Sequence, residues 1–469
     1  MSQNEIKLYY KNVKSQIIGD RDGITEKQFQ ELEKLTTPAI KRVNEERQAG
    51  KTPYRELPYK QENLKEVNRL TALLNDKCEN LVILGIGGSA LGAIALQTAL
   101  KPYTHNLDES RRIGPRLFVF DNVDPAQFAE FLEYISDKLD KTIFNVVSKS
   151  GRTAETASQF LIVRELLLNK FGPKGLRKHL VATTDSEKGT LRNIVEDEGL
   201  LSLQVPEGVG GRFSVLSAVG LFMAAMEQMD TEALLAGARD MDARVSSENF
   251  CENPAAINAA INYHYYNRGK KISVMMPYAY GLKDLADWYR QLWAESLGKK
   301  TDLADTEVHI GPTPVKALGT TDQHSQVQLY REGPNDKLFT FLHVNHFEKD
   351  LKIAHAPKIA PELAYLADSK MSKLLNSEKA ATEYALLKDK RPCITVYFDR
   401  LDAYSTGQFI YLYEVTTSLA ADLFNINAYD QPAVELAKEA TFALMGRQGY
   451  EMSGPQIQTI TNIDEKFLV

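Results

Sequence analysis

Short apolar runs alternate along this chain with longer segments in which apolar residues recur at helical spacing. The first five runs are rich in branched residues and cover 81–86, 116–122, 142–149, 180–185 and 201–205. Segments of helical length separate most of them, and residues 153–172 form the clearest of these. This alternation predicts βαβ units and a parallel sheet.

A second series of runs begins near residue 272 and covers 272–280, 338–346 and 393–400. Helical patterns lie between and after these runs, at 282–298, 361–387 and 406–425. The fold predicted is therefore α/β, with two tandem doubly wound parallel sheets that carry helices on both faces.

The pattern also predicts how the chain is divided. Residues 1–60 are polar and helical, so we expect an arm that lies on the first domain. The two α/β domains are expected over 61–245 and 255–430, with a joint between them, and a C-terminal helix and tail over 431–469.

Composition narrows the class of protein. The 469 residues are 43% hydrophobic and 25% charged, which is ordinary for a globular chain. No window approaches the roughly 20 apolar residues of a membrane helix, and residues 1–16 lack the apolar core of a signal peptide. Cys78, Cys251 and Cys393 are too scattered for a disulfide framework, which favours the cytoplasm. The net charge of −6 argues against nucleic acid as a partner.

The stretch LVILGIGGSALG has a strand, a glycine turn and a helix in succession. Gly85, Gly87 and Ala90 match the spacing of a dinucleotide fingerprint, but the acidic residue that should follow about 20 positions later is absent, since Asp121 lies too far along. Glycines at a strand end also let a backbone approach a phosphate, and Ser89 adds a hydroxyl. A purely structural tight turn is the remaining alternative.

A second strand, TIFNVV, runs into Ser148, Lys149, Ser150, Gly151 and Thr153 ahead of a helix. Hydroxyls and consecutive amides at a helix N-terminus suit a phosphate monoester, although Ser and Thr are favoured there as ordinary caps. Two such loops at strand ends of one sheet favour a shared phosphate site.

Arg212 follows three glycines and stands at the head of an apolar helix, 214–223. A cation there opposes the helix dipole, so we expect it to stabilise negative charge on a substrate. A surface arginine with a snorkelling stem is the alternative.

Gln291 and Glu295 are four residues apart on one helix face. Gly298 is expected to end the helix in a left-handed C-cap. Glu295 then lies in the last turn, where carbonyl dipoles raise the pKa of a carboxylate and make it a better base. A solvated surface glutamate is the alternative.

Three further residues suit proton transfer or binding. His324 comes just after an expected helix cap at Asp322, which favours a neutral imidazole. Gln431 and Lys438 are seven apart on a helix that Pro432 begins, so both are expected to face one cleft. A metal site at His343 and His346 is rejected, because no third ligand accompanies them.

Together these stretches resemble the glucose-6-phosphate isomerase (phosphoglucose isomerase) family, over nearly the whole chain. The shared motifs GIGGSALG, VVSKSGRTAET, GGRFSVLSAVGL, QLWAESLGK, QHSQVQL and DQPAVELAK occur in the family's order. The resemblance implies two sugar-isomerase (SIS) domains. It also implies interconversion of glucose 6-phosphate and fructose 6-phosphate through a cis-enediol, in glycolysis and gluconeogenesis. The family uses no metal and no organic cofactor and is usually a dimer.

Residue roles follow from the resemblance alone. Glu295 is implied as the base that moves a proton between C1 and C2, and Arg212 as the stabiliser of the enediolate. His324, supplied by the neighbouring chain, and Lys438 are implied in ring opening. The implied substrate contacts are Gln291 and Gln431 for the sugar, and Gly87, Gly88, Ser89, Ser148, Lys149, Ser150 and Thr153 for the phosphate.

Three alternatives remain open from sequence. A dual isomerase would also accept mannose 6-phosphate, and a non-catalytic SIS-domain sensor would keep the hydroxyl loop without a need for Glu295. An NAD-dependent oxidoreductase would explain the glycine spacing.

The sequence departs from the family pattern at Arg152, which stands where the family often has a small or hydroxyl residue.

Overall fold

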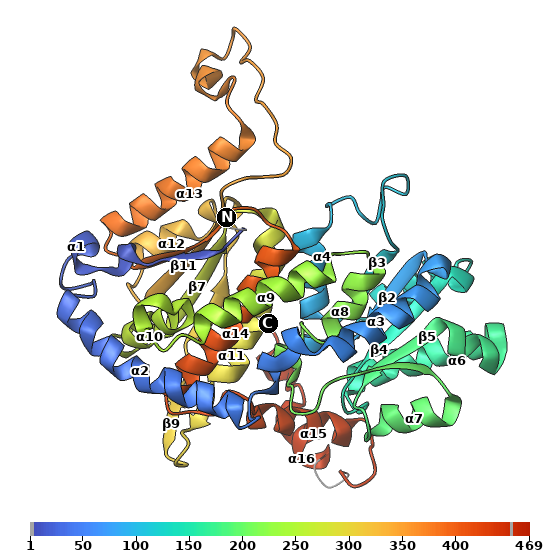
Figure 1. Cartoon of the computed structure of the whole chain (residues 1–469). Helices are drawn as coiled ribbons and strands as arrows, with labels where there is room; N and C mark the ends of the chain where they lie inside the picture. Colours follow the sequence, from blue (N-terminus) through green and yellow to red (C-terminus); the bar gives the residue numbers. More distant parts are fainter. Residues whose placement is uncertain (1–3, 451–453) are drawn as a thin grey trace.

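The computed structural model describes residues 4–450 and 454–469 and contains two five-stranded sheets (Figure 1). The first sheet has the order β3-β2-β4-β5-β6 and is parallel throughout. Its strands are β2 (Asn80–Leu84), β3 (Arg116–Phe120), β4 (Thr142–Val147), β5 (Leu180–Thr184) and β6 (Leu201–Gln204).

The second sheet has the order β10-β7-β11-β12-β1 and is parallel except at β1. Its strands are β7 (Ile272–Pro277), β10 (Thr313–Lys316), β11 (Lys337–Val344), β12 (Cys393–Phe398) and β1 (Lys7–Tyr9). A separate hairpin pairs β8 (Lys299–Thr301) with β9 (Glu307–Ile310).

Both sheets are wound in the same way. Apart from β1, the chain enters each sheet at the strand next to an edge, β2 or β7, moves to that edge at β3 or β10, and then returns to the other side at β4 or β11. Each sheet therefore reverses its winding direction between β2 and β4, or between β7 and β11. This confirms the predicted α/β fold of two doubly wound sheets.

Alternate residues of the buried strands face two different cores. In β2, Val82 and Leu84 pack into a core on the outer face of the first sheet, whereas Leu81 and Ile83 belong to a larger core that also reaches the second sheet. This alternation follows from the two-residue period of a strand, and both faces are apolar because helices cover both.

The helices lie in layers around the two sheets (Figure 1). The outer face of the first sheet is covered by α5 (Pro125–Ile135), α6 (Ala154–His179) and α7 (Thr190–Glu198), and that of the second by α12 (Val327–Glu332) and α13 (Met371–Lys388). The shared core contains α2 (Glu26–Gln48), α3 (Gln61–Leu74), α4 (Leu91–Leu100), α8 (Ala218–Met226), α9 (Thr231–Val245), α10 (Pro254–Asn267), α11 (Lys283–Leu297) and α14 (Ala403–Leu423). The remaining helices are α1 (Ser15–Ile18), α15 (Glu435–Leu444) and α16 (Gly454–Thr461). None of the helices within the described ranges is long and apolar enough to cross a membrane.

The N-terminal arm does not lie on the first domain alone, so that expectation was wrong. Strand β1 pairs antiparallel with β12 and extends the second sheet by one strand. Further along the arm, Arg47 and Arg55 both donate hydrogen bonds to the buried carboxylate of Asp242 on α9. The arm is fixed because it supplies a partner for a sheet edge and a counter-charge for a buried acid.

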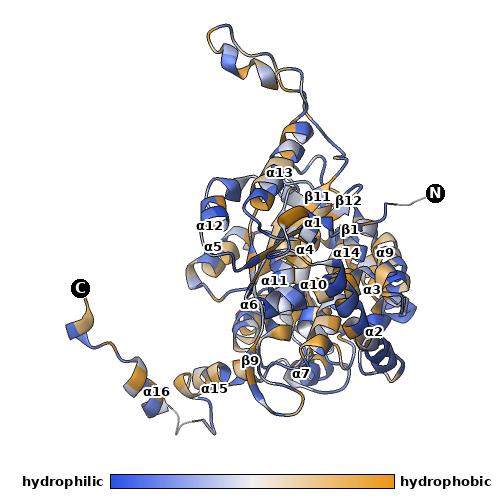
Figure 2. Ribbon diagram, turned by 90° about the vertical axis from the view of Figure 1, so that its left-hand side faces the viewer, coloured by the Kyte–Doolittle hydropathy of each residue, from blue (hydrophilic) through white to orange (hydrophobic). Residues whose placement is uncertain are grey.

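The predicted helix over 361–387 was also partly wrong. Residues Pro361–Leu366 form a 3-10 helix, and α13 begins only at Met371. Asp368 between them has a φ of +64°, which no α-helix accommodates. The segment that leads into α13 projects from the body of the molecule, as does the C-terminal segment that follows α15 (Figure 2).

Candidate active site

The glycine loop after β2 packs directly on two other parts of the chain. Residues Gly87–Ser89 form a 3-10 turn ahead of α4, and Gly87 has a φ of +57°. A Cβ atom at Gly87 would lie 2.9 Å from Nε2 of Gln291, and one at Gly88 only 2.1 Å from the carbonyl carbon of Gly211. The glycines are therefore required for close approach to the segments that carry Gln291 and Arg212.

The hydroxyl loop after β4 has the form of an anion cradle. Ser148 is buried, and its Oγ accepts a hydrogen bond from the amide of Gly151 at 3.1 Å. Thr153 is the N-cap of α6, but its side chain caps no backbone amide. The first amides of α6 thus lack the side-chain acceptor that an ordinary cap supplies, which leaves donors for an anion.

The hydroxyl loop is also tied to the segment that precedes Arg212. The ammonium of Lys149 donates to the carbonyl of Val209 at 3.2 Å, while Ser150 and Arg152 are exposed. The guanidinium of Arg152 forms no hydrogen bond or ion pair with the part of the chain that the structure describes.

The glycine loop and the hydroxyl loop flank one position in the first sheet. They follow β2 and β4, which are hydrogen-bonded neighbours, and the winding direction reverses between these strands. Ligands of open α/β sheets bind at this kind of position, outside the carboxyl ends of the strands.

Arg212 is buried, and all three nitrogens of its guanidinium donate hydrogen bonds. Nε donates to Oγ of Ser296 at 2.7 Å, and Nη1 donates to Oε1 of Gln431 at 2.8 Å. Nη2 donates to the carbonyls of Ala428 at 2.5 Å and Asp430 at 3.1 Å. Burial lowers the pKa of Arg212, and the nearby negative charges oppose that effect.

The expected position of Arg212 at the head of a helix was wrong. Arg212 lies in a 3-10 turn, Gly211–Phe213, and α8 begins only at Ala218 with Ser217 as its cap. The alternative of a surface arginine is excluded as well, because Arg212 is 3% exposed. Its position is set by the carbonyls and side chains that surround it.

Glu295 lies where Gln291 and Arg212 meet. Its Oε2 accepts a hydrogen bond from Nε2 of Gln291 at 3.2 Å and lies 3.5 Å from Nη1 of Arg212. The other carboxylate oxygen, Oε1, has no hydrogen-bond partner among the described residues, and the side chain is 27% exposed. A fixed, partly accessible carboxylate with one free oxygen can accept a proton.

Gly298 ends α11 differently from the prediction. Its φ of −74° and ψ of 100° are extended, so it is not a left-handed C-cap. Glycine is needed because a Cβ there would lie 2.8 Å from the carbonyl of Ala294. The prediction failed because glycine serves equally at a left-handed cap and at a point of close packing.

Two candidates do not join this cluster. His324 is exposed at the end of a 3-10 turn, and α12 begins only at Val327, so Asp322 does not cap an α-helix. Lys438 is exposed on α15, where its ammonium contacts Glu435 at 2.7 Å. Gln431 accepts a hydrogen bond from Arg212, whereas Lys438 donates one to Glu435.

Sequence reasoning missed three residues that surround Arg212 and Glu295. Ser296 and Asp430 accept hydrogen bonds from Arg212, and Lys299 contacts the backbone of both Glu295 and Asp430. All three lie within the motifs QLWAESLGK and DQPAVELAK. Lys299 had a further signal, since a cation just beyond a helix C-terminus favours the helix dipole.

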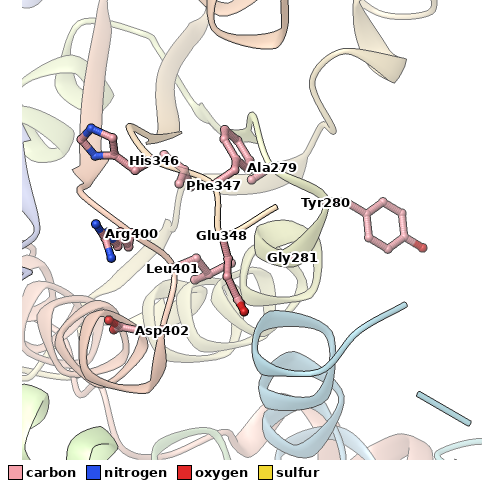
Figure 3. Close-up of a pocket in the computed structure, with 10 residues that line it drawn as sticks. Ala279, Tyr280, Gly281, His346, Phe347, Glu348, Arg400, Leu401 and Asp402 are labelled. Carbon is pink, nitrogen blue, oxygen red and sulfur yellow. The ribbon is translucent and has the colours of Figure 1, made fainter. Parts of the chain in front are cut away.

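A cavity of about 720 Å³ lies elsewhere, at the end of the second sheet (Figure 3). The loops after β7, β11 and β12 line it, with Tyr280, His346 and Arg400 among its residues. It includes none of the candidate residues. His346 there contacts Asp399, and no three His, Cys, Asp or Glu side chains within 4–450 and 454–469 form a group that could hold a metal ion.

Comparison with known proteins decides the family. The family model described as phosphoglucose isomerase matches residues 71–453. The chain is 45% identical to the glucose-6-phosphate isomerase of Carboxydothermus hydrogenoformans, over 92% of this chain and 91% of that protein. The chain belongs to the phosphoglucose isomerase family.

Other proteins agree with this family in extent and fold. The glucose-6-phosphate isomerase of Rubrobacter xylanophilus is 44% identical, over 80% of this chain and 84% of that protein. A hypothetical protein from Thermus thermophilus superposes with a TM-score of 0.83 at 32% identity, over 94% of this chain and 100% of that one. The glucose-6-phosphate isomerase of Chlamydia trachomatis superposes at 0.78 with 22% identity, over 99% of this chain and 90% of that one, which shows a shared fold.

Proposed function

We propose that this chain interconverts glucose 6-phosphate and fructose 6-phosphate. The observation that carries the proposal is the Glu295 carboxylate, held between Gln291 and Arg212, both of which adjoin the glycine loop. Membership of the phosphoglucose isomerase family supports the same reaction.

The phosphate is proposed to bind at the hydroxyl loop and the glycine loop. The hydroxyls of Ser148, Ser150 and Thr153 and the first amides of α6 are the donors, with Ser89 and the backbone of Gly87–Ser89 opposite them. This anchors one end of the sugar, so that binding energy from the phosphate can position C1 and C2.

The proton transfer follows from the arrangement of Glu295 and Arg212. With glucose 6-phosphate in its open form, the carboxylate removes the proton on C2, and the C2–H electrons form the C1=C2 bond of the enediolate. The negative charge that develops on oxygen is stabilised by the guanidinium of Arg212. The C2 hydroxyl then gives up its proton, the C1 oxygen takes one up, and Glu295 returns its proton to C1 as the C2=O bond forms. The product is fructose 6-phosphate, with no net change of redox state.

Ring opening is proposed to use His324 and Lys438, with His324 donated by a second copy of the chain. In one chain His324 contacts none of the other candidates within the described ranges. The projecting segments expose Leu351, Ile359 and Phe467, and apolar side chains so exposed are typical of an interaction surface (Figure 2). We therefore propose a homodimer with shared sites.

Two coarser assignments accompany this proposal. The sheets support domain limits near 61–245 and 255–430, because β2 to β6 and β7 to β12 fall within these ranges. We also propose a cytoplasmic location, which the free thiols of Cys78, Cys251 and Cys393 favour.

The test is a coupled assay of fructose 6-phosphate conversion, with mannose 6-phosphate run beside it. We expect glucose 6-phosphate as the product, with turnover that survives prolonged treatment with a chelator. A folded protein that binds phosphosugars but does not turn them over would support the sensor alternative. Turnover restored only by a divalent ion would refute the metal-free mechanism.

A further inference from the structure

Lys299 is a buried lysine whose ammonium is fully occupied by hydrogen bonds. It is 9% exposed and lies two residues beyond the end of α11. Nζ donates to the backbone carbonyl of Glu295 at 2.9 Å and to that of Asp430 at 2.7 Å, and it lies 3.1 Å from Oδ1 of Asp430. Three acceptors match the three N–H donors of an ammonium.

These acceptors belong to the two segments that build the candidate active site. The last turn of α11 carries Glu295, and residues 428–431 supply both carbonyls that hold Arg212. The carbonyl of Asp430 accepts from Lys299 and from Arg212 at once. Lys299 therefore joins the helix end that carries the base to the segment that fixes the guanidinium.

The charges around this junction give Lys299 an electrostatic effect as well. Glu295 and Asp430 face Lys299 from α11 and from 428–431, and Arg212 faces it from its own turn. Burial lowers the pKa of Lys299, while its hydrogen bond and ion pair with Asp430 act in the opposite direction. In its charged form, Lys299 places a second positive charge beside Arg212 near the Glu295 carboxylate.

We propose that Lys299 is a positioning residue of the isomerase site. Its ammonium holds the C-terminal turn of α11 against residues 428–431, and so fixes the Glu295 carboxylate relative to the Arg212 guanidinium. This inference rests on the proposed function, and Lys299 itself touches no reacting atom.

The test compares Lys299→Met with a matched control, Lys270→Met. Lys270 is also a buried lysine, and its ammonium contacts the backbone and side-chain oxygens of Asn335 at 3.0 and 2.6 Å, with no contact to the candidate site. Both variants should lose thermal stability. Only Lys299→Met should lose kcat, by about 10- to 100-fold, because small displacements of catalytic groups cost rate.

Two readouts separate positioning from a purely structural role. In Lys299→Met the KM for fructose 6-phosphate should change little while kcat falls, since the phosphate loops are intact. Lys299→Arg, which keeps the charge and can donate to the same carbonyls, should recover most of kcat.

The outcome that overturns the proposal is equally specific. If Lys299→Met keeps the wild-type kcat and loses only stability, as Lys270→Met does, Lys299 is structural. If Lys299→Met does not fold, Lys299→Gln, which keeps two donors without the charge, is judged by the same kcat and KM criteria. Wild-type protein is assayed in the same series, so that a failure of the proposed function appears there first.

Discussion

Replacing Arg212 by lysine should damage catalysis far more than binding. The guanidinium donates to four acceptors, at Ser296, Ala428, Asp430 and Gln431, and lies 3.5 Å from the Glu295 carboxylate. A lysine ammonium has only three donors in a different geometry, so at least one acceptor is left without a partner. Each buried orphan costs about 1–3 kcal/mol of folding free energy.

The loss of rate should be larger than this loss of stability suggests. Removing one group that stabilises a developing oxyanion typically lowers kcat by about 10²–10³-fold. Burial already lowers the pKa of Arg212, and a lysine in the same place gives up its proton more readily. The assay is kcat and KM for fructose 6-phosphate, with thermal denaturation in parallel.

A matched control for Arg212→Lys is Arg391→Lys. Arg391 is also buried, just ahead of β12, and donates to the backbone carbonyls of Arg331 and Gly333, which are not part of the candidate site. We expect Arg391→Lys to lose stability with kcat unchanged. An Arg212→Lys enzyme whose kcat stays within about threefold of wild type would remove Arg212 from transition-state stabilisation.

The double variant Ser148→Ala, Thr153→Ala should weaken competitive inhibition by sorbitol 6-phosphate, since hydrogen bonds to a charged group contribute roughly 1.5–3 kcal/mol each; an unchanged inhibition constant would show that the cradle is misplaced. His324→Ala and Glu295→Gln dimers, each inactive alone, should recover about a quarter of wild-type activity when they are mixed and exchange subunits. Half of the resulting dimers are hybrids, and each hybrid has one intact site of two. No recovery would place His324 in the same chain as Glu295. Glu414 is buried with no hydrogen-bond partner for either carboxylate oxygen in the described part of the chain, and burial raises its pKa well above the ordinary value. The folded state therefore holds a proton that the unfolded state releases, so the stability of the wild type falls as pH rises above the unfolded pKa. The free energy of unfolding of Glu414→Gln should rise relative to wild type by up to about 1.4 kcal/mol per pH unit in that range. A difference in melting temperature between the two proteins that is constant from pH 6 to pH 8 would contradict this.

The fold was predictable because its signals are strong and local. Buried parallel strands such as 81–86 and 142–149 stand out as apolar runs between long helical patterns. Strand β1 was missed because three residues of an edge strand carry no pattern, and only the unpaired edge of β12 gives them a place. The helix predicted over 361–387 failed because apolar spacing does not reveal a left-handed residue such as Asp368.

Sequence motifs contain four of the side chains that the structure brings together, but they do not show how these side chains are held. Arg212, Gln291, Glu295 and Gln431 are linked by two hydrogen bonds and one ion pair. The sequence could not show that Arg212 is held by backbone carbonyls, because main-chain acceptors have no residue signature. Lys299 could have been noticed as a cation just beyond a helix C-terminus, but its partners could not be predicted, since two of the three are carbonyl oxygens.

The most direct measurement of the central claim is hydrogen exchange at C2 of glucose 6-phosphate in deuterated water, with wild-type and Glu295→Gln protein. Gln keeps the shape of Glu and one hydrogen-bonding oxygen but cannot take the proton as a carboxylate does. Loss of a positioned base typically lowers the rate by about 10²–10⁴-fold, so exchange and turnover should both nearly vanish while phosphosugar binding remains. Exchange at a near wild-type rate in Glu295→Gln would contradict the assignment of Glu295 as the base.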